Sequence, residues 1–236
     1  MAMARSIGML VFPRMTQLDM TGPYEVLARL PDTKVELIAR SRKPVATDRG
    51  LQIVPTTTYA ECPPLDVIMV PGGPGQQELM EDEEALGFLR RQAAKAQFVT
   101  SVCTGSLVLG AAGLLKGKRA TCHWNALEHL KLLGAIPVSE KVVVDGNVVT
   151  GAGVTSGIDF ALALAAILDG EQAAREIQLG IEYDPAPPFD SGSPKTAPRD
   201  MVDRLRARGR QLYEARKTMA ARVGRKLGII PAVQDN

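Results

Sequence analysis

Cys103 stands where a nucleophile is expected, at the junction between a strand-like segment and an apolar helical segment. Residues 99–102 (VTSV) precede it, and Thr104 and Gly105 lead into the helix. A sharp strand–turn–helix junction pushes its central side chain out of the sheet, an arrangement called a nucleophile elbow. The N-terminus of the helix beneath the thiol is expected to lower the pKa of the thiol and favour the thiolate. The sequence therefore predicts Cys103 as a catalytic nucleophile.

Proton transfer at such a thiol needs a second group, and three side chains are candidates. Asp19 opens a helix just after the first strand, which places it at the same edge of a parallel sheet as Cys103. A carboxyl that is close to a thiolate and shielded from water has a raised pKa, which suits acid–base chemistry near neutral pH. Glu25 is the competing carboxylate, and His123 either approaches the thiol or supports the site from behind. We predict Asp19 as the general acid and base.

Glycine-rich turns follow two strands and are expected to hold the substrate. Gly72 and Gly73 lie in residues 71–75 (PGGPG), and Gly153 and Val154 follow another strand. Glycines permit tight turns and a close approach of the backbone to a ligand. The amides of the first turn, together with the amide of Thr104, are predicted to stabilise a developing anion.

The order of the predicted elements is that of a doubly wound α/β domain. Continuous apolar runs indicate buried parallel strands, and segments with helical spacing separate them. Reactive groups gather at the carboxyl ends of the strands in such sheets. We therefore expect a mostly parallel sheet with helices on both faces. Strands are predicted over 7–12, 34–39, 51–58, 65–70 and 98–102, a hairpin over 141–150, and helices over 19–30, 83–96, 105–115, 125–134, 156–168 (capped by Ser156) and 171–181.

Composition favours a cytoplasmic globular protein without a metal or a membrane partner. The 236 residues are 45% hydrophobic, and no run approaches the roughly 18 apolar residues that a membrane span needs. The first residues lack the layout of a secretion signal. Cys62, Cys103 and Cys122 form no CxxC motif or cluster with histidine. A disulfide framework and a zinc site are therefore not expected.

The last part of the chain is strongly basic. Residues 184–198 carry five prolines and are predicted to form an extended loop at the end of a domain of residues 1–198. From 199 to 226, ten lysines and arginines accompany three acids, a local charge of +7 against −5 for the rest. Apolar residues at three- and four-residue steps form a stripe that a nucleic-acid arm would not need. We predict that 199–236 is one basic helix, packed on its own domain or on a second subunit, with no nucleic acid as partner.

Several motifs resemble the PfpI-like cysteine-elbow superfamily over about residues 5–185. The most specific are 18–23 (LDMTGP), 101–105 (SVCTG) and 150–160 (TGAGVTSGIDF), with 71–75 and 120–124 (ATCHW) beside them. Class I glutamine amidotransferases are more distant relatives, which implies a flavodoxin-like sheet. The closest resemblance is to members that hydrate isonitriles. It implies addition of water to an isonitrile through a thioimidate on Cys103, release of an N-substituted formamide, proton transfer by Asp19, a small-molecule substrate, no cofactor and a homodimer.

Other members of the superfamily supply the alternatives. The protease-like members carry histidine directly after the cysteine, whereas this chain has Thr104, which we therefore include among the candidate catalytic residues. Deglycases, cofactor-free glyoxalases and oxidative-stress sensors carry glutamate in the region of Asp19. Ligand-sensing domains of AraC-like regulators append paired helix-turn-helix units, whereas residues 199–236 predict a single helix. The pairing of Asp19 with Thr104 favours isonitrile hydration over these alternatives.

Overall fold

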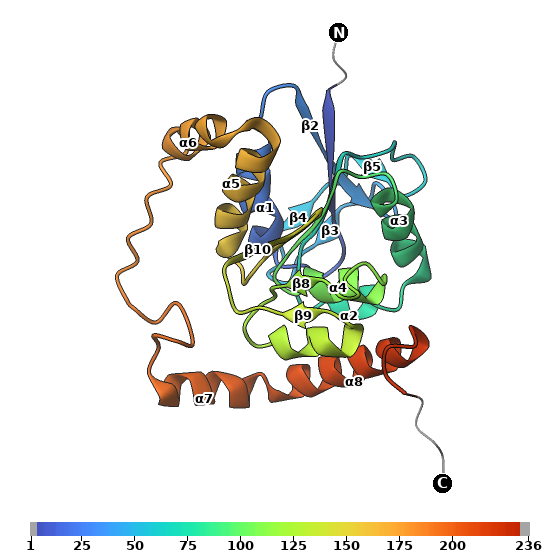
Figure 1. The fold of residues 1–236 in the computed structure, drawn as a ribbon, viewed down its shortest axis with the longest axis vertical. Coiled ribbons are helices and arrows are strands. Elements are labelled where there is room, and N and C mark those ends of the chain that lie inside the picture. The colour runs from blue at the N-terminus through green and yellow to red at the C-terminus, as the bar shows by residue number, and fades with distance from the viewer. Residues whose placement is uncertain (1–3, 232–236) are drawn as a thin grey trace.

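A seven-stranded sheet forms the centre of the molecule (Figure 1). In this computed structural model, which describes residues 4–231, the sheet contains β1 (Arg5–Leu10), β2 (Thr33–Ala39), β5 (Thr57–Thr58), β6 (Val67–Val70), β7 (Phe98–Val102), β10 (Val142–Asp145) and β11 (Val148–Gly151). Their order is β10-β11-β7-β6-β1-β2-β5, and every neighbouring pair is parallel except the hairpin of β10 and β11. The carboxyl ends of the parallel strands therefore meet along one edge.

Helices cover both faces of this sheet. One face carries α1 (Gln17–Leu27), α5 (Ser156–Asp169) and α6 (Glu171–Gly180), where α5 packs against both of the others. The other face carries α2 (Gln76–Leu79), α3 (Glu83–Ala93), α4 (Gly105–Ala111) and the 3₁₀-helix η1 (Leu127–Leu133). The predicted doubly wound α/β class is confirmed. Two small sheets pair β3 (Val45–Ala46) with β4 (Gln52–Ile53) and β8 (Arg119–Ala120) with β9 (Ile136–Pro137).

The strand and the helix next to the elbow lie in the core. All four residues of β6 are buried, as are all seven residues of α4, which directly follows Cys103. A helix that is apolar on every side belongs in the interior, because no face of it gains from contact with water. Protein interiors are close-packed and resist displacement. The elbow is therefore held between elements that have little freedom to move.

Several elements differ from the sequence predictions. The basic tail is two helices, α7 (Arg199–Arg208) and α8 (Arg210–Lys226), because the chain breaks at Gly209 and glycine is a poor residue for a helix interior. The predicted helix over 125–134 is the shorter η1, which ends at Gly134 with φ 79°. The predicted strand over 51–58 is divided into β4 and β5. Ser156 is the first residue of α5, and Thr155 precedes it without a side-chain capping bond.

The C-terminal helices return across the carboxyl edge of the sheet. An extended segment over 182–198 leads away from α6 and delivers α7 and α8 to that edge, as Figure 1 shows. There α8 packs on η1 and α4. The approach is close, since a Cβ added at Gly224 would lie 2.0 Å from the carbonyl oxygen of Leu132. Among the described residues, no helix is both long enough and apolar enough to cross a membrane.

Candidate active site

The backbone at Cys103 has the strained geometry of an elbow. Its φ of 58° is in the left-handed region, which non-glycine residues adopt at a cost of about 1–3 kcal/mol and mostly at functional sites. The Cys103 amide donates to the carbonyl oxygens of Gly151 and Ala152, both at 3.0 Å. A Cβ at Gly105 would lie 2.0 Å from the carbonyl oxygen of Val70, so the helix start fits against β6 only with glycine there. These contacts fix the thiol at the carboxyl end of β7.

Asp19 is the buried carboxyl of the site. It lies in the first turn of α1 and has no exposed surface. The amide of Gly72 donates to Oδ2 of Asp19 at 3.0 Å. The other oxygen, Oδ1, is buried and accepts no hydrogen bond from a nitrogen or oxygen of the described residues. The thiol of Cys103 interacts with this carboxyl. The structure thus brings the two predicted catalytic groups together and leaves one carboxyl oxygen free to bond.

Burial raises the pKa of both groups. The pKa of Asp19 is raised to about 7, because desolvation outweighs the hydrogen bonds from Cys103 and Gly72. Burial also raises the pKa of the Cys103 thiol well above its ordinary value, and the negative charge of Asp19 adds to the effect. The expected lowering of the thiol pKa is therefore wrong. The amide of Thr104 does favour the thiolate, but a thiol that is 5% exposed loses more by leaving water.

Thr104 holds the glycine turn and does not leave its hydroxyl free. The amide of Gly73 donates to Oγ1 of Thr104 at 3.0 Å, and the hydroxyl is 3.4 Å from the carbonyl oxygen of Gly73. The turn lies very close to the elbow, because a Cβ at Gly72 would be 2.5 Å from the Thr104 nitrogen. Since the Gly72 amide already binds Asp19, the predicted anion-binding role of these two glycine amides is not supported. Their hydrogen bonds position catalytic groups instead.

The loop after β11 packs against His123. A Cβ at Gly153 would lie 2.8 Å from Cδ2 of this imidazole, and Val154 is half-buried in the same loop. The amide of Asn125 donates to Nδ1 of His123 at 3.2 Å. Burial lowers the pKa of His123 to about 4, and the charge of Arg216 contributes. His123 is therefore neutral at physiological pH with one nitrogen already occupied, which makes it a poor general base.

Glu25 does not join the site. Its side chain is 57% exposed and forms an ion pair with Arg29, which lies just beyond the end of α1. It is not among the groups that act on Cys103 or Asp19. Of the two candidate carboxylates, Asp19 is the one that lies beside Cys103. The spacing of six residues places Glu25 on the solvent side of the helix whose start is buried.

The site contains three residues that the sequence analysis did not select. Cys122 is buried, and a charge on it acts on Cys103. Arg216 of α8 is buried, and its Nε donates to Oε1 of Gln76 at 2.8 Å. A signal for Arg216 was present, because it falls on the apolar stripe of the basic tail, four residues after Leu212 and seven before Val223. A charged residue at a core position of a helix needs a specific partner.

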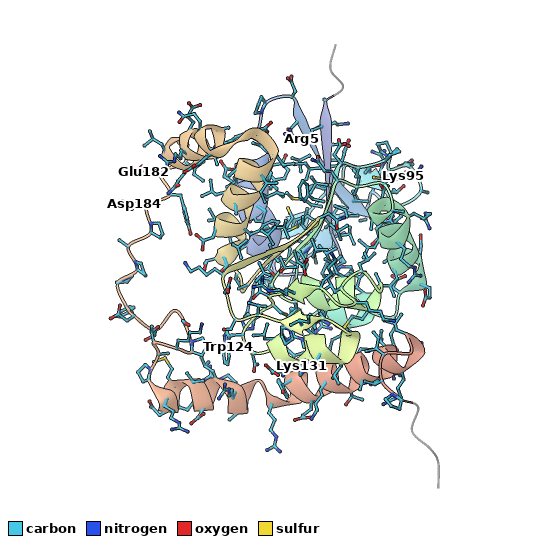
Figure 2. All side chains as sticks on the ribbon, in the orientation of Figure 1. Arg5, Lys95, Trp124, Lys131, Glu182 and Asp184 are labelled. Atoms are coloured by element: carbon cyan, nitrogen blue, oxygen red, sulfur yellow. The ribbon has the colours of Figure 1, made fainter. Side chains whose placement is uncertain are left out.

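A cavity of about 460 Å³ lies between the domain and the C-terminal helices. Trp124, which follows His123, forms one wall, and Figure 2 shows it above α7. The guanidinium of Arg206 lies 5.8 Å from the Trp124 ring centre, within the range of a cation–π contact. Cys103 and Asp19 do not line this cavity. The neighbouring His123 has its ring centre 5.7 Å from that of Trp124.

The chain is similar to known proteins both in sequence and in structure. Residues 5–167 match the model of the DJ-1/PfpI family. Isonitrile hydratase from Pseudomonas putida is 57% identical over 227 residues, which cover 96% of this chain and all of that protein. A crystal structure of a ThiJ/PfpI family protein from Pseudomonas syringae superposes with a TM-score of 0.90 at 44% identity, over 92% of this chain and 90% of the other. The resemblance expected from the motifs is confirmed.

A transcriptional regulator is also similar to part of the chain. The HTH-type transcriptional regulator GbdR from Pseudomonas aeruginosa is 30% identical over 186 residues. The match covers 75% of this chain but only 49% of the regulator. The shared part is therefore about half of the regulator, whereas the match to the hydratase runs along that whole protein.

Proposed function

We propose, on the premise that this chain belongs to the DJ-1/PfpI family, that it is an enzyme that hydrates isonitriles to N-substituted formamides. The whole-length similarity to a hydratase supports the substrate class. The observation that carries the chemistry is the buried Asp19 carboxyl beside the Cys103 elbow. A nucleophile and a proton carrier meet there in a site shielded from water, and a divalent isonitrile carbon needs both.

The first step forms a covalent thioimidate. With a pKa of about 7, Asp19 is available as a carboxylate near neutral pH and accepts the proton of the Cys103 thiol. The thiolate sulfur attacks the terminal isonitrile carbon and forms a carbon–sulfur bond. Asp19 returns the proton to that carbon, which gives Cys103–S–CH=N–R. The net change is the addition of S–H to carbon, so Asp19 ends the step ionised again.

The second step adds water and releases the enzyme. Asp19 removes a proton from water as the oxygen attacks the imidate carbon, and it passes this proton to the nitrogen. The resulting tetrahedral adduct collapses: its hydroxyl proton leaves, a carbonyl forms, and the carbon–sulfur bond breaks. Cys103 recovers its proton, and the product is a formamide, O=CH–NH–R. Isonitrile and water are thus consumed one for one without a redox change.

The glycine turns and Thr104 position these groups. Gly72 orients the Asp19 carboxyl, and Gly73 ties the same turn to Thr104. The loop with Gly153 and Val154 follows the two carbonyls that hold the Cys103 amide, and we assign it to the wall that faces the substituent R. Precise placement of reacting groups is worth several orders of magnitude in rate. We place His123 outside the proton transfer because its pKa is about 4.

Incubation with cyclohexyl isocyanide tests this function. The expected product is N-cyclohexylformamide, which mass spectrometry identifies, with one oxygen from solvent when the reaction is run in H₂¹⁸O. Cys103→Ser serves as the control for catalysis by the site. A protein that leaves isocyanides unchanged and instead consumes methylglyoxal belongs with the glyoxalase alternative. Oxidation of Cys103 by peroxide without turnover of either compound supports the sensor alternative.

We further propose that the protein is a cytoplasmic homodimer. Leu179 and Phe189 are 82% and 77% exposed, and they lie in α6 and in the segment that follows it. Large apolar side chains in such a position favour association with another surface. Light scattering on the purified protein is expected to give twice the chain mass of 25.3 kDa. The double variant Leu179→Ser/Phe189→Ser is expected to shift the mass toward that of the monomer.

A further inference from the structure

Arg216 brings a buried positive charge from α8 to the catalytic edge of the sheet. It is 7% exposed, and no carboxylate of the described residues forms an ion pair with it. The two charges that act on it are those that Cys122 and Cys103 carry when ionised. A buried ion without a counter-ion costs several kcal/mol. Burial accordingly lowers the pKa of Arg216. Such a residue requires a compensating role.

A chain of hydrogen bonds connects Arg216 to the elbow. Its Nε donates to Oε1 of Gln76 at 2.8 Å, and Gln76 has no exposed surface. The backbone N–H of Gln76 donates to the carbonyl oxygen of Gly73 at 3.2 Å, and the backbone N–H of Gly73 donates to Oγ1 of Thr104 at 3.0 Å. Thr104 directly follows the nucleophile. The turn that holds Asp19 and Thr104 is thus tied to the C-terminal helix.

Other arginines of α8 behave differently. Arg222 forms a two-bond ion pair with Glu81 and is half exposed. Its charge is neutralised locally and lies in contact with water, where ion pairs contribute little. Arg216 instead faces the interior, and its charge also lowers the pKa of His123 and His129. The charge of Arg216 therefore acts on groups near the site, whereas the charge of Arg222 is neutralised by Glu81.

We propose that Arg216 is a positioning residue for the reaction at Cys103, which holds the glycine turn through Gln76 and stabilises negative charge on the sulfur. This inference rests on the proposed role of Cys103. It makes α8 part of the catalytic unit, although the family match ends at residue 167. Formation of a thiolate in a buried site is unfavourable unless a positive charge is near. A fixed guanidinium supplies that charge without reorganisation during the reaction.

The pH dependence of Cys103 alkylation tests the charge without using the isonitrile reaction. Iodoacetamide is applied from pH 6 to 11, and peptide mapping follows Cys103 separately from the other thiols. For Arg216→Gln, the apparent pKa of alkylation is expected to rise by about one unit, whereas Arg216→Lys keeps the charge and stays near the parent. Arg222→Gln is the matched control on the same helix and is expected to leave the profile unchanged. In turnover, Arg216→Gln is expected to lower kcat more than it changes KM.

Gln76→Glu is a second variant that tests the charge even if Arg216→Gln does not fold. A carboxylate at this position pairs with Arg216 and keeps α8 docked, but it cancels the positive charge. The melting temperature is expected to hold while the alkylation pKa rises. An unchanged profile in Gln76→Glu and in folded Arg216→Gln overturns the inference. If the variants shift the alkylation pKa as expected but the parent protein hydrates no isonitrile, the proposed function is overturned and the role of Arg216 stays in place.

Discussion

At the scale of single residues, the site consists of two acids whose proton equilibria are shifted by the same cause. Both Cys103 and Asp19 lie out of contact with water, and burial disfavours their charged forms. Their pKa values remain in the order thiol above carboxyl, so the resting pair near neutral pH is a thiol beside a partly ionised carboxyl. Attack on the substrate must therefore begin with proton transfer from sulfur to Asp19.

Replacement of Cys103 by alanine is expected to abolish turnover and preserve the fold. The thiol forms the covalent bond, and alanine removes only the sulfur atom while it keeps Cβ at this backbone position. Cys62 is partly exposed in a loop away from the elbow, so Cys62→Ser is the matched control and should retain most activity. Formamide production and circular dichroism measure the two effects. Turnover by Cys103→Ala would rule out the covalent mechanism.

Asp19→Asn is expected to lower kcat/KM by about 10²–10⁴-fold, the usual contribution of a general acid–base group. In the parent protein, kcat/KM should rise with pH through an inflection near 7, because the carboxylate form accepts the thiol proton. The inflection should be absent in Asp19→Asn. Glu25→Gln is the control on the same helix and should keep both the rate and the profile. The reverse result, loss of rate in Glu25→Gln alone, would transfer the role to Glu25.

The same carboxyl makes stability depend on pH. Its pKa rises from about 4 when unfolded to about 7 when folded, so the folded protein binds the proton more tightly. This stabilisation is fully present below pH 4 and is lost as the pH rises through 7, at about 1.4 kcal/mol per unit of pKa difference. Relative to Asp19→Asn, the parent should therefore become less stable between pH 4 and 8. Urea unfolding of both proteins at several pH values measures the difference.

At the scale of elements, Thr104 joins the start of α4 to the turn after β6. Thr104→Val removes the acceptor of the Gly73 amide, and a buried donor left without a partner costs about 1–3 kcal/mol. The displaced turn should lower kcat by roughly tenfold or more, since small shifts of reacting groups are costly. Thr104→Ser retains the hydroxyl and should stay near the parent. Equal kinetics in Thr104→Val would show that the amide of this residue suffices.

Local sequence signals predict the elements well and their contacts less well. The elbow at Cys103 and the hairpin around Gly146 follow from glycine placement and β-branched runs within a few neighbours. The bond from Gly72 to Asp19 joins residues 53 apart, and no pattern along the chain shows which amide receives which acceptor. The thiol pKa was predicted in the wrong direction for a related reason. Helix polarity is a local property, whereas the extent of burial depends on the whole fold.

At the scale of the molecule, the C-terminal helices complete the core at the catalytic edge. A truncation after Pro198 removes α7 and α8, whose residues Ala220 and Val223 are buried in the part of α8 that packs on η1. The shortened protein is expected to lose solubility or association, and its activity should fall because Arg216 is absent. Sedimentation and formamide assays measure these effects. Salt-dependent binding of the full chain to duplex DNA, lost on truncation, would instead assign the basic surface to nucleic acid.

The exposed segment over 182–198 connects the C-terminal helices to the domain but does not hold them against it. It carries the chain from α6 to α7 and is largely exposed, so it contributes little to the interior. The helix α8 beyond it is held to the domain by its own side chains, among them Arg216, which bonds to Gln76, and Arg222, which bonds to Glu81. Cleavage within this segment is therefore expected to leave the docked helices bound to the domain. A separate peptide of α7 and α8 is therefore expected to bind at the catalytic edge of the sheet, although more weakly than the attached helices, because it lacks the effective concentration that the covalent link provides.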